Sequence, residues 1–96
     1  MIVWSEEALI DLREIYNYVS KHSPKNAEMM VKTFAELVDS IEFMPLKFPK
    51  EPFINQENIR FIAKWTFKII YVVQKDKIII LNIFNTNQNP EKLIFD

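Results

Sequence analysis

The chain has 96 residues, 49% hydrophobic and 26% charged, with a net charge of −1, which excludes an intrinsically disordered chain and predicts a single domain over residues 1–96. It has no cysteine and one histidine, which excludes a disulfide framework, a thiolate metal site and any site built on two imidazoles, so we expect no metal and no cofactor. Residues 1–45 carry a net charge of −4 and residues 46–96 a net charge of +3, so an anionic partner is expected at the C-terminal half.

A short strand is predicted at residues 1–4 and an amphipathic helix at residues 6–20. Ser5 stands where the helix N-cap belongs, and two glutamates follow in the first turn, where the helix dipole favours negative charge. Trp4 and Leu9 occupy the positions of a hydrophobic staple. The apolar stripe of this helix consists of Ala8, Leu9, Leu12, Ile15, Tyr16 and Val19. Its acidic side chains are interpreted as a solvated face, with a partner contact as the alternative: Glu6, Glu7, Asp11 and Glu14.

A second helix is predicted to begin at the pair Ser23 and Pro24, an N-cap serine followed by proline at the first helical position. Pro45 closes this helix. Its apolar stripe consists of Ala27, Met30, Val31, Phe34, Leu37, Val38 and Ile41. Because only about three or four residues join the two helices, they must lie antiparallel as a hairpin.

Residues 45–58 contain three prolines and no clear periodicity, which predicts a surface loop. From Ile59 the apolar period changes to two, which is typical of β-strands. The three strands expected are Ile59–Lys64, Thr66–Gln74 and Lys77–Phe84. A tight polar turn between the last two gives an antiparallel meander. The fold class is therefore α+β in the order β-α-α-β-β-β, with the place of the first strand in the sheet left open.

The central strands are apolar on both faces. Tyr71 points to one face, whereas Ile70 and Val72 point to the other. A sheet that helices cover on one side only should alternate between apolar and polar residues. Something must therefore cover the face of Ile70 and Val72: the C-terminal tail, a second copy of the chain or another protein.

Several short motifs occur in a specific order along the chain. Trp4-Ser5, Asp11-Leu12 and Ser23-Pro24 come first; Arg60, the stretch 65–71 and the ending 83–90 follow. In order and spacing, over almost its whole length, the chain resembles the RelE/ParE toxin superfamily. The resemblance implies the toxin of a type II toxin–antitoxin pair, with the ParE-like plasmid stabilisation branch slightly favoured.

The resemblance implies a small cognate antitoxin as partner, in a homodimer or a toxin–antitoxin hetero-oligomer, and growth inhibition as the effect. ParE-like members bind and poison DNA gyrase, whereas RelE-like members cut mRNA on the ribosome. A degenerate, inactive member is the third alternative. No apolar run approaches the roughly 20 residues of a membrane-spanning helix, so we expect no membrane partner. The cytoplasm is the expected compartment.

Metal-free ribonuclease chemistry needs a general base, a general acid and a cation for the phosphate. If the chain is RelE-like, the resemblance assigns these roles to Arg60 and Tyr71, supported by Lys64 and Lys68. Each has a structural alternative: Arg60 as a paired charge, the lysines as solvated strand residues, and Tyr71 as core. An exposed Arg60 could be replaced by alanine with the fold intact.

Many relatives carry His and Arg where this chain has Asn85 and Asn87. Asparagine cannot act as a general base and carries no charge for a phosphate, and the pI of 5.8 is low for an RNA binder. Both features favour the ParE-like hypothesis. The two asparagines are then interpreted as turn residues. The expected partner-binding surface consists of Arg60, Ile70, Val72, Asn85 and Asn87.

Overall fold

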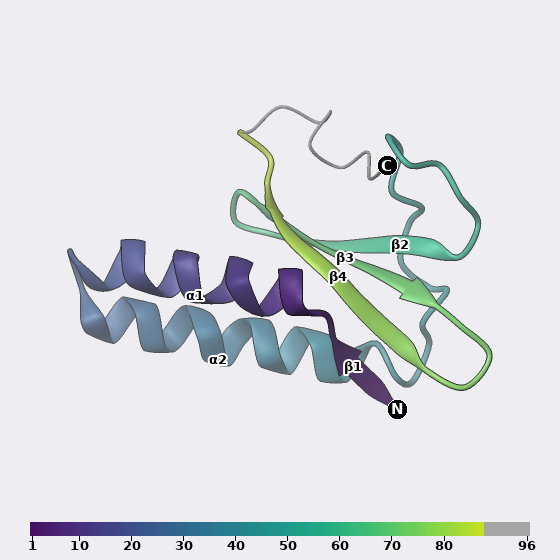
Figure 1. Ribbon diagram of the computed structural model, residues 1–96, viewed down its shortest axis with the longest axis horizontal. Coiled ribbons are helices and arrows are strands. Elements are labelled where there is room, and N and C mark those ends of the chain that lie inside the picture. Colours follow the sequence, from purple (N-terminus) through teal and green to yellow (C-terminus); the bar gives the residue numbers. More distant parts are fainter. Residues whose placement is uncertain (88–96) are drawn as a thin grey trace.

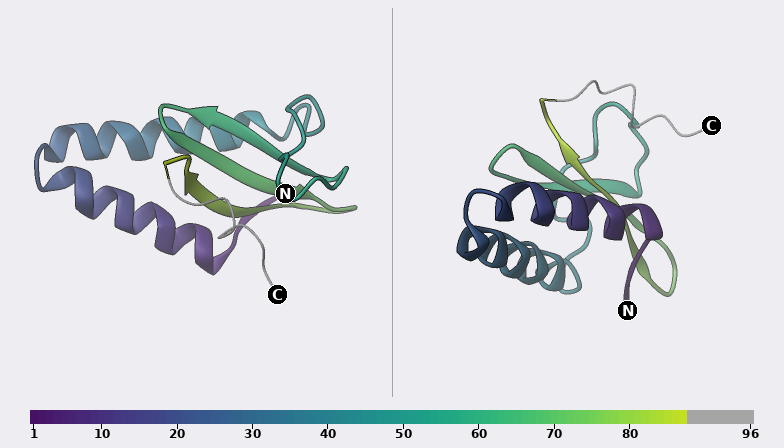
Figure 2. Two further views of the ribbon diagram at one scale, coloured as in Figure 1. Left: turned by 90° about the horizontal axis from the view of Figure 1, so that it is seen from above. Right: turned by 60° about the vertical axis from the view of Figure 1, so that its left-hand side comes forward.

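Two helices cover one face of a four-stranded sheet in the computed structural model, which describes residues 1–87 (Figure 1). The elements in chain order are β1 (Ile2–Trp4), α1 (Glu6–Ser20), α2 (Pro24–Ser40), β2 (Ile59–Lys64), β3 (Phe67–Val73) and β4 (Ile78–Asn85). This order confirms the predicted β-α-α-β-β-β fold. The antiparallel helices project beyond the sheet at their connecting turn (Figures 1 and 2).

Both predicted N-caps are present. The Ser5 hydroxyl accepts a hydrogen bond from the Ala8 N–H at 3.0 Å and donates one to the Leu81 carbonyl at 2.9 Å. It therefore starts α1 and also ties the helix to β4. Ser23 caps α2 by accepting from the Asn26 N–H at 3.2 Å. Such caps stabilise a helix by about 1 kcal/mol each.

Two details of the predicted helices are wrong. Helix α2 ends at Ser40, before Pro45, because the Ile41 N–H bonds the Val38 carbonyl in a tighter i→i−3 turn. Leu9 is 47% exposed and lies outside the buried stripe, since it is turned about 100° around the helix from the fully buried Ala8.

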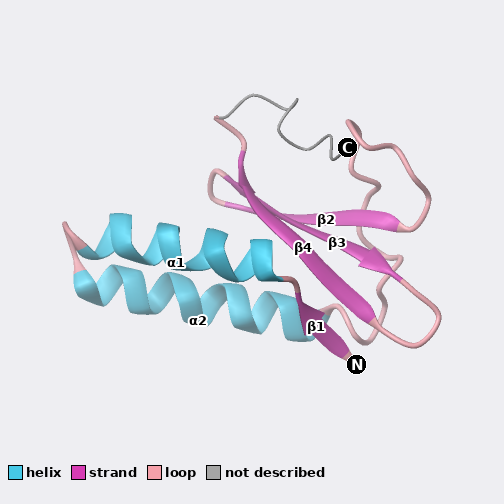
Figure 3. Ribbon diagram, viewed as in Figure 1, coloured by secondary structure: helices cyan, strands magenta, loops and turns pink. Residues whose placement is uncertain are grey.

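The strand order β1-β4-β3-β2 places β1 at one edge of the sheet and β2 at the other (Figure 3). β1 pairs parallel with the first half of β4, from Ile2 opposite Ile78 to Trp4 opposite Ile80. The other pairs are antiparallel and form the predicted meander. The sheet is therefore mixed, which decides the position that the sequence left open.

The helix-facing side of the sheet carries the main core. Phe34 from α2 is fully buried there against strand residues from the centre of the sheet. Burying a large apolar side chain of this kind stabilises the fold by roughly 1.5–3 kcal/mol. The largest buried side chains of this core are Phe34, Ile41, Ile69, Tyr71 and Ile80.

The opposite face holds a smaller apolar cluster, and the long loop between α2 and β2 covers part of it (Figure 3). Residues 49–51 run beside β2, with the Phe61 N–H bonded to Pro49 and the Glu51 N–H bonded to Ile59. Ile54 from the loop then packs on the cluster. This loop is a cover that none of the three expected ones anticipates. The C-terminal tail lies outside the described residues.

Two turns require a positive φ without glycine. Asn55 has a φ of 53° and Trp65 a φ of 54°. Asparagine tolerates this region, but a bulky side chain there costs roughly 1–3 kcal/mol. Trp65 and Thr66 form the two-residue connection between β2 and β3.

Candidate functional site

Arg60 is directed into the protein and holds the long loop in place. Its guanidinium donates to the carbonyls of Leu46 at 3.2 Å, Phe48 at 3.0 Å and Glu57 at 2.8 Å. It also bonds the Glu57 carboxylate at 2.7 Å. The expectation of an exposed Arg60 is wrong, since its side chain is only 12% exposed. Four of its five N–H groups have partners, so little of it is left for a phosphate.

Lys68 is likewise engaged inside the protein. Its ammonium lies 3.2 Å from a carboxylate oxygen of Glu51 and 4.6 Å from the ring centre of Phe61. Glu51 is fully buried, and its other oxygen accepts from the N–H groups of Phe53 and Ile54 at 2.9 and 2.8 Å. The prediction of a solvated Lys68 is therefore wrong: this pair fastens the loop to the far face of the sheet.

Tyr71 is fully buried in the main core. Its hydroxyl donates to the Pro45 carbonyl at 2.5 Å, which anchors the start of the long loop. Burial raises the pKa of Tyr71 to about 12, although the nearby Arg60 charge opposes the rise. The phenol therefore stays protonated at neutral pH and has no free path to a substrate.

Lys64 is the one exposed member of the four catalytic candidates, with its ammonium 5.1 Å from the ring centre of Trp65. It lies four residues from Arg60 along β2, a separation of about 13 Å. Arg60 pairs with Tyr71 across the strands, so these two share the helix-facing side, whereas Lys68 lies on the opposite face. The structure does not bring the four side chains together.

The residues expected to bind a partner have different surroundings. Ile70 is fully buried and Val72 half-buried in the far-face cluster. Asn85 and Asn87 form a local turn in which the Asn85 side-chain oxygen accepts from the Asn87 N–H at 3.0 Å. This is the turn role predicted for them. Asn85 also lines a groove.

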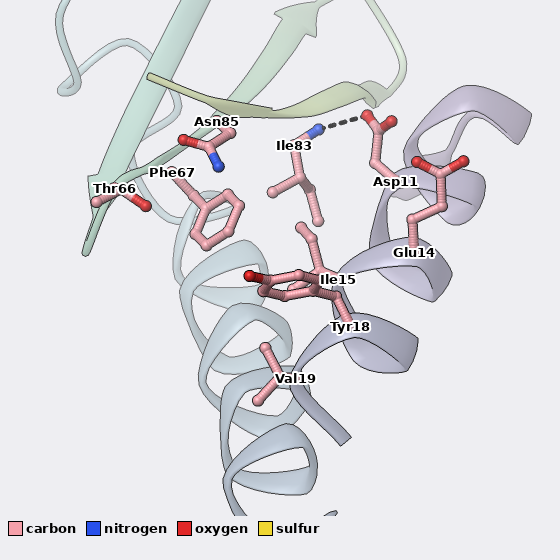
Figure 4. Close-up of a pocket in the computed structure, with 9 residues that line it drawn as sticks. All are labelled: Asp11, Glu14, Ile15, Tyr18, Val19, Thr66, Phe67, Ile83 and Asn85. Atoms are coloured by element: carbon pink, nitrogen blue, oxygen red, sulfur yellow. Dashed lines mark hydrogen bonds between the residues drawn. The ribbon is translucent and has the colours of Figure 1, made fainter. Parts of the chain in front are cut away.

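The groove has a volume of about 570 Å³ and lies between α1 and the adjoining ends of β3 and β4 (Figure 4). Apolar side chains from both layers form its interior, and polar groups from both sides line it. From α1 it is lined by Asp11, Glu14, Ile15, Tyr18 and Val19, and from the sheet by Thr66, Phe67, Ile83 and Asn85. An apolar interior with a few polar groups is typical of a binding site.

Asp11 joins the two walls of the groove. One of its oxygens accepts from the Ile83 N–H at 2.9 Å (Figure 4). The same oxygen accepts from the Asn82 side-chain amide at 3.4 Å. Burial raises the pKa of Asp11 above its ordinary 3.8, the two hydrogen bonds oppose the rise, and the Glu14 and Glu7 charges add to it. The carboxylates give this side of the groove a negative potential.

The same groove opens onto an edge of the sheet. β1 pairs only with residues Ile78 to Ile80 of β4. At the next residue the Ser5 hydroxyl donates a hydrogen bond to the Leu81 carbonyl. The Ile83 N–H points to Asp11 and away from β3. Because the backbone N–H and C=O groups of successive strand residues point to opposite sides, those of Asn85, two residues later, also point to this edge. Within residues 1–87, no strand pairs with this second half of β4 on that side.

Three of the residues that line the groove were not among the predicted site residues: Tyr18, Thr66 and Phe67. The sequence could have indicated Tyr18, because it is an aromatic residue outside the apolar stripe and lies four positions after Glu14, on the same side of the helix. In the structure Tyr18 is 69% exposed. Thr66 and Phe67 reach the groove only through the β2–β3 turn. Within the described residues, no three acidic or histidine side chains are grouped to hold a metal ion.

Comparisons with known proteins agree on the relationship of the chain. The family model for the ParE toxin of the type II toxin–antitoxin system parDE matches residues 2–90. A solved structure described as the chromosomal ParDE TA system from P. aeruginosa superposes with a TM-score of 0.72 at 25% identity. The match covers 88% of this chain and 92% of that one. No curated protein matches the chain.

Proposed function

Since the chain belongs to the ParE toxin family of type II toxin–antitoxin systems, we propose that it inhibits growth by binding DNA gyrase and is neutralised by a small cognate antitoxin. The proposed site of action is the cytoplasm. No helix within residues 1–87 is long and apolar enough to cross a membrane.

One observation carries the choice of gyrase over mRNA. Three of the four side chains that an RNA-cutting relative would need are engaged within the protein. Arg60 bonds loop carbonyls, Lys68 pairs with a buried carboxylate, and Tyr71 is buried with its hydroxyl bonded to the Pro45 carbonyl. General acid–base catalysis needs groups that can reach the proton they transfer. Their engagement supports a toxin that acts by binding.

The groove supports the antitoxin half of the proposal. It joins an apolar interior to the carboxylates of Asp11 and Glu14 and to an edge of β4 that no strand within residues 1–87 occupies, where a peptide strand would pair beyond the Ile83 N–H that Asp11 already holds. Peptides that bind in this way gain main-chain hydrogen bonds at the edge and specificity from side-chain pockets. We therefore place the antitoxin segment in the groove beside Asp11 and Asn85.

Expression in a bacterial host, with DNA and RNA followed in the same culture, tests the target. We expect gyrase-dependent DNA breaks with intact mRNA, and inhibition of supercoiling when the purified protein is added to gyrase. Rapid mRNA cleavage during translation would instead assign the RelE-like activity. Normal growth with folded protein present would assign the degenerate alternative.

Two matched variants sharpen the test. Lys64→Ala changes the one exposed member of the catalytic candidates and should leave toxicity unchanged. Co-expression of the proposed cognate antitoxin should restore growth to both the wild type and the variant. Loss of toxicity in a folded Lys64→Ala protein would count against the gyrase proposal and for RNA cleavage.

A further inference from the structure

Trp65 occupies a backbone position that a bulky residue rarely takes. Its φ of 54° falls in the left-handed region, where asparagine and glycine are the usual residues. The chain itself uses asparagine at its other such position, Asn55. A tryptophan in this turn therefore goes against its backbone preference, and the contacts of its indole ring have to offset that cost.

The contacts of the indole within the protein cover only about half of the Trp65 surface. Its ring meets the ring of Phe34 edge-on, with centres 5.6 Å apart, and the Lys64 ammonium lies 5.1 Å from its centre. The residue is nevertheless 49% exposed. Tryptophan is among the residues most enriched at binding hot spots, where a rigid aromatic surface gains most from losing water.

Trp65 does not itself line the groove but directly precedes two residues that do. The next two residues, Thr66 and Phe67, line the groove, and Phe34 packs on Phe67 as well as on Trp65. Thr66 and Phe67 lie across the groove from Asp11 and Glu14 (Figure 4). The groove therefore has an acidic side on α1 and an aromatic side at the β2–β3 turn.

The two sides differ in the ligand that they accept. Glu14 and Asp11 favour a basic side chain, with Glu7 adding negative charge nearby. At the other side the Lys64 ammonium already stands over the indole, so a second cation there would be repelled. Along α1 the groove extends from Asp11 to Tyr18, about 10 Å.

We propose that Trp65 anchors the antitoxin segment: its exposed indole surface receives an apolar side chain, and a basic side chain of the same segment lies against Asp11 and Glu14 on the opposite side of the groove. This inference rests on the proposed function. An acidic residue next to the apolar anchor would complement Lys64. The charge difference between the two sides thereby sets the direction in which the segment lies.

The two tryptophans of the chain allow a direct test in the intact complex. We would incorporate 5-fluorotryptophan, add the proposed cognate antitoxin in purified form, and assign the two fluorine resonances with Trp4→Phe. The Trp65 resonance should shift and lose its solvent isotope effect on binding, while Trp4, which packs on the core, changes little. A Trp65 resonance that is unchanged in a formed complex would overturn the proposal.

Substitution separates anchoring from a structural role. Trp65→Asn removes the ring but relieves the backbone, so the melting temperature should stay close to that of the wild type while affinity for the same protein falls by at least about tenfold. The matched control is Phe43→Asn, which removes an 87% exposed aromatic side chain outside the groove and should leave affinity unchanged. Unchanged affinity of Trp65→Asn would refute the anchor.

A second variant keeps the test decisive if Trp65→Asn does not fold. Glu14→Lys reverses an exposed groove charge and should weaken binding by about tenfold with a smaller salt dependence, whereas Glu36→Lys on α2 should not. Equal affinities for these two variants would contradict the proposal that the groove charges set the direction of the antitoxin segment. If the wild-type protein does not bind the proposed antitoxin at all, the proposed function itself is contradicted, and not only the role of Trp65.

Discussion

The charged residues of this protein are used in two different ways in two regions of the fold, the long loop and the groove. Around the long loop, Arg60 and the pair Lys68 and Glu51 are enclosed and paired within the fold. Along the groove, Glu14 is exposed, and Asp11 is partly buried with one oxygen bonded to β4. Residues of the same types therefore stabilise the loop in one region and remain available to a partner in the other.

This difference follows from how far each side chain is removed from water. A buried charge must be paired, because its desolvation otherwise costs several kcal/mol. An exposed charge contributes little to stability and can be spared for recognition. The two regions should accordingly respond to mutation in opposite ways: the loop contacts through stability and the groove through binding.

The largest effect is expected at the buried ion pair. Lys68→Met keeps the length of the side chain but leaves the Glu51 carboxylate buried without a cation, which should lower the free energy of unfolding by about 3–5 kcal/mol. Urea unfolding measures this loss. Lys64→Met, the same change at an exposed strand position, should alter stability by less than about 0.5 kcal/mol. Equal stability of the two variants would contradict the role assigned to Lys68.

Arg60→Ala should have the next largest effect. It removes four hydrogen bonds at once and leaves loop carbonyls without their donor, so we expect a loss of about 2–3 kcal/mol. Arg60→Lys should recover only part of this, because an ammonium cannot reproduce the forked geometry of a guanidinium. Toxicity assays of Arg60→Ala must therefore be made on protein whose fold has been checked by circular dichroism.

A smaller effect is expected from Tyr71→Phe. The ring keeps its packing while the hydrogen bond to Pro45 is lost, which should cost about 1 kcal/mol and lower the melting temperature by roughly 4–8 °C. Growth inhibition by the variant should equal that of the wild type at a temperature where both are folded. Selective loss of toxicity with full stability would assign Tyr71 a catalytic role instead.

The smallest effect is expected in the groove and depends on pH. Because burial raises the pKa of Asp11 above 3.8, the folded protein holds this proton more tightly than the unfolded chain does. The stabilisation from this group is complete below pH 3.8 and is lost as the pH rises through the raised pKa. Asp11→Asn does not titrate and can still accept from the Ile83 N–H.

The stability of Asp11→Asn relative to the wild type should therefore increase as the pH rises across that window. Urea unfolding at a series of pH values measures the difference, with the exposed Glu36→Gln as the control that shows no such trend. A relative stability that falls with rising pH would mean that the hydrogen bonds to Asp11 outweigh its burial.

Local sequence rules predicted most of the elements of the fold. Ser5 and Ser23 start the two helices because a hydroxyl at these positions satisfies an N–H group that the helix leaves free. The bounds of β2 agree with the prediction from its alternating pattern. These features depend on neighbours within a few residues of one another in the chain, so a single sequence contains them.

The same local rules could not predict the surroundings of the candidate site residues. Arg60 and Tyr71 match family positions, yet their surroundings depend on a loop whose path has no periodicity to reveal it. Asp11 belonged to an acidic patch interpreted as solvated, although one of its oxygens bonds β4. Contacts between residues more than 70 positions apart leave no local pattern.

The sequence alone determined the helical hairpin, the three-stranded meander and the relationship to the toxin superfamily, because periodicity, caps and motif order are written along the chain. Only the tertiary structure decided which charged residues are enclosed and which are available. Folding the loop over β2 buries Glu51 and Arg60. Pairing β1 with only half of β4 leaves an open edge beside Asp11. Burial is a property of the packed layers, so it distinguishes residues that the sequence presents as equivalent.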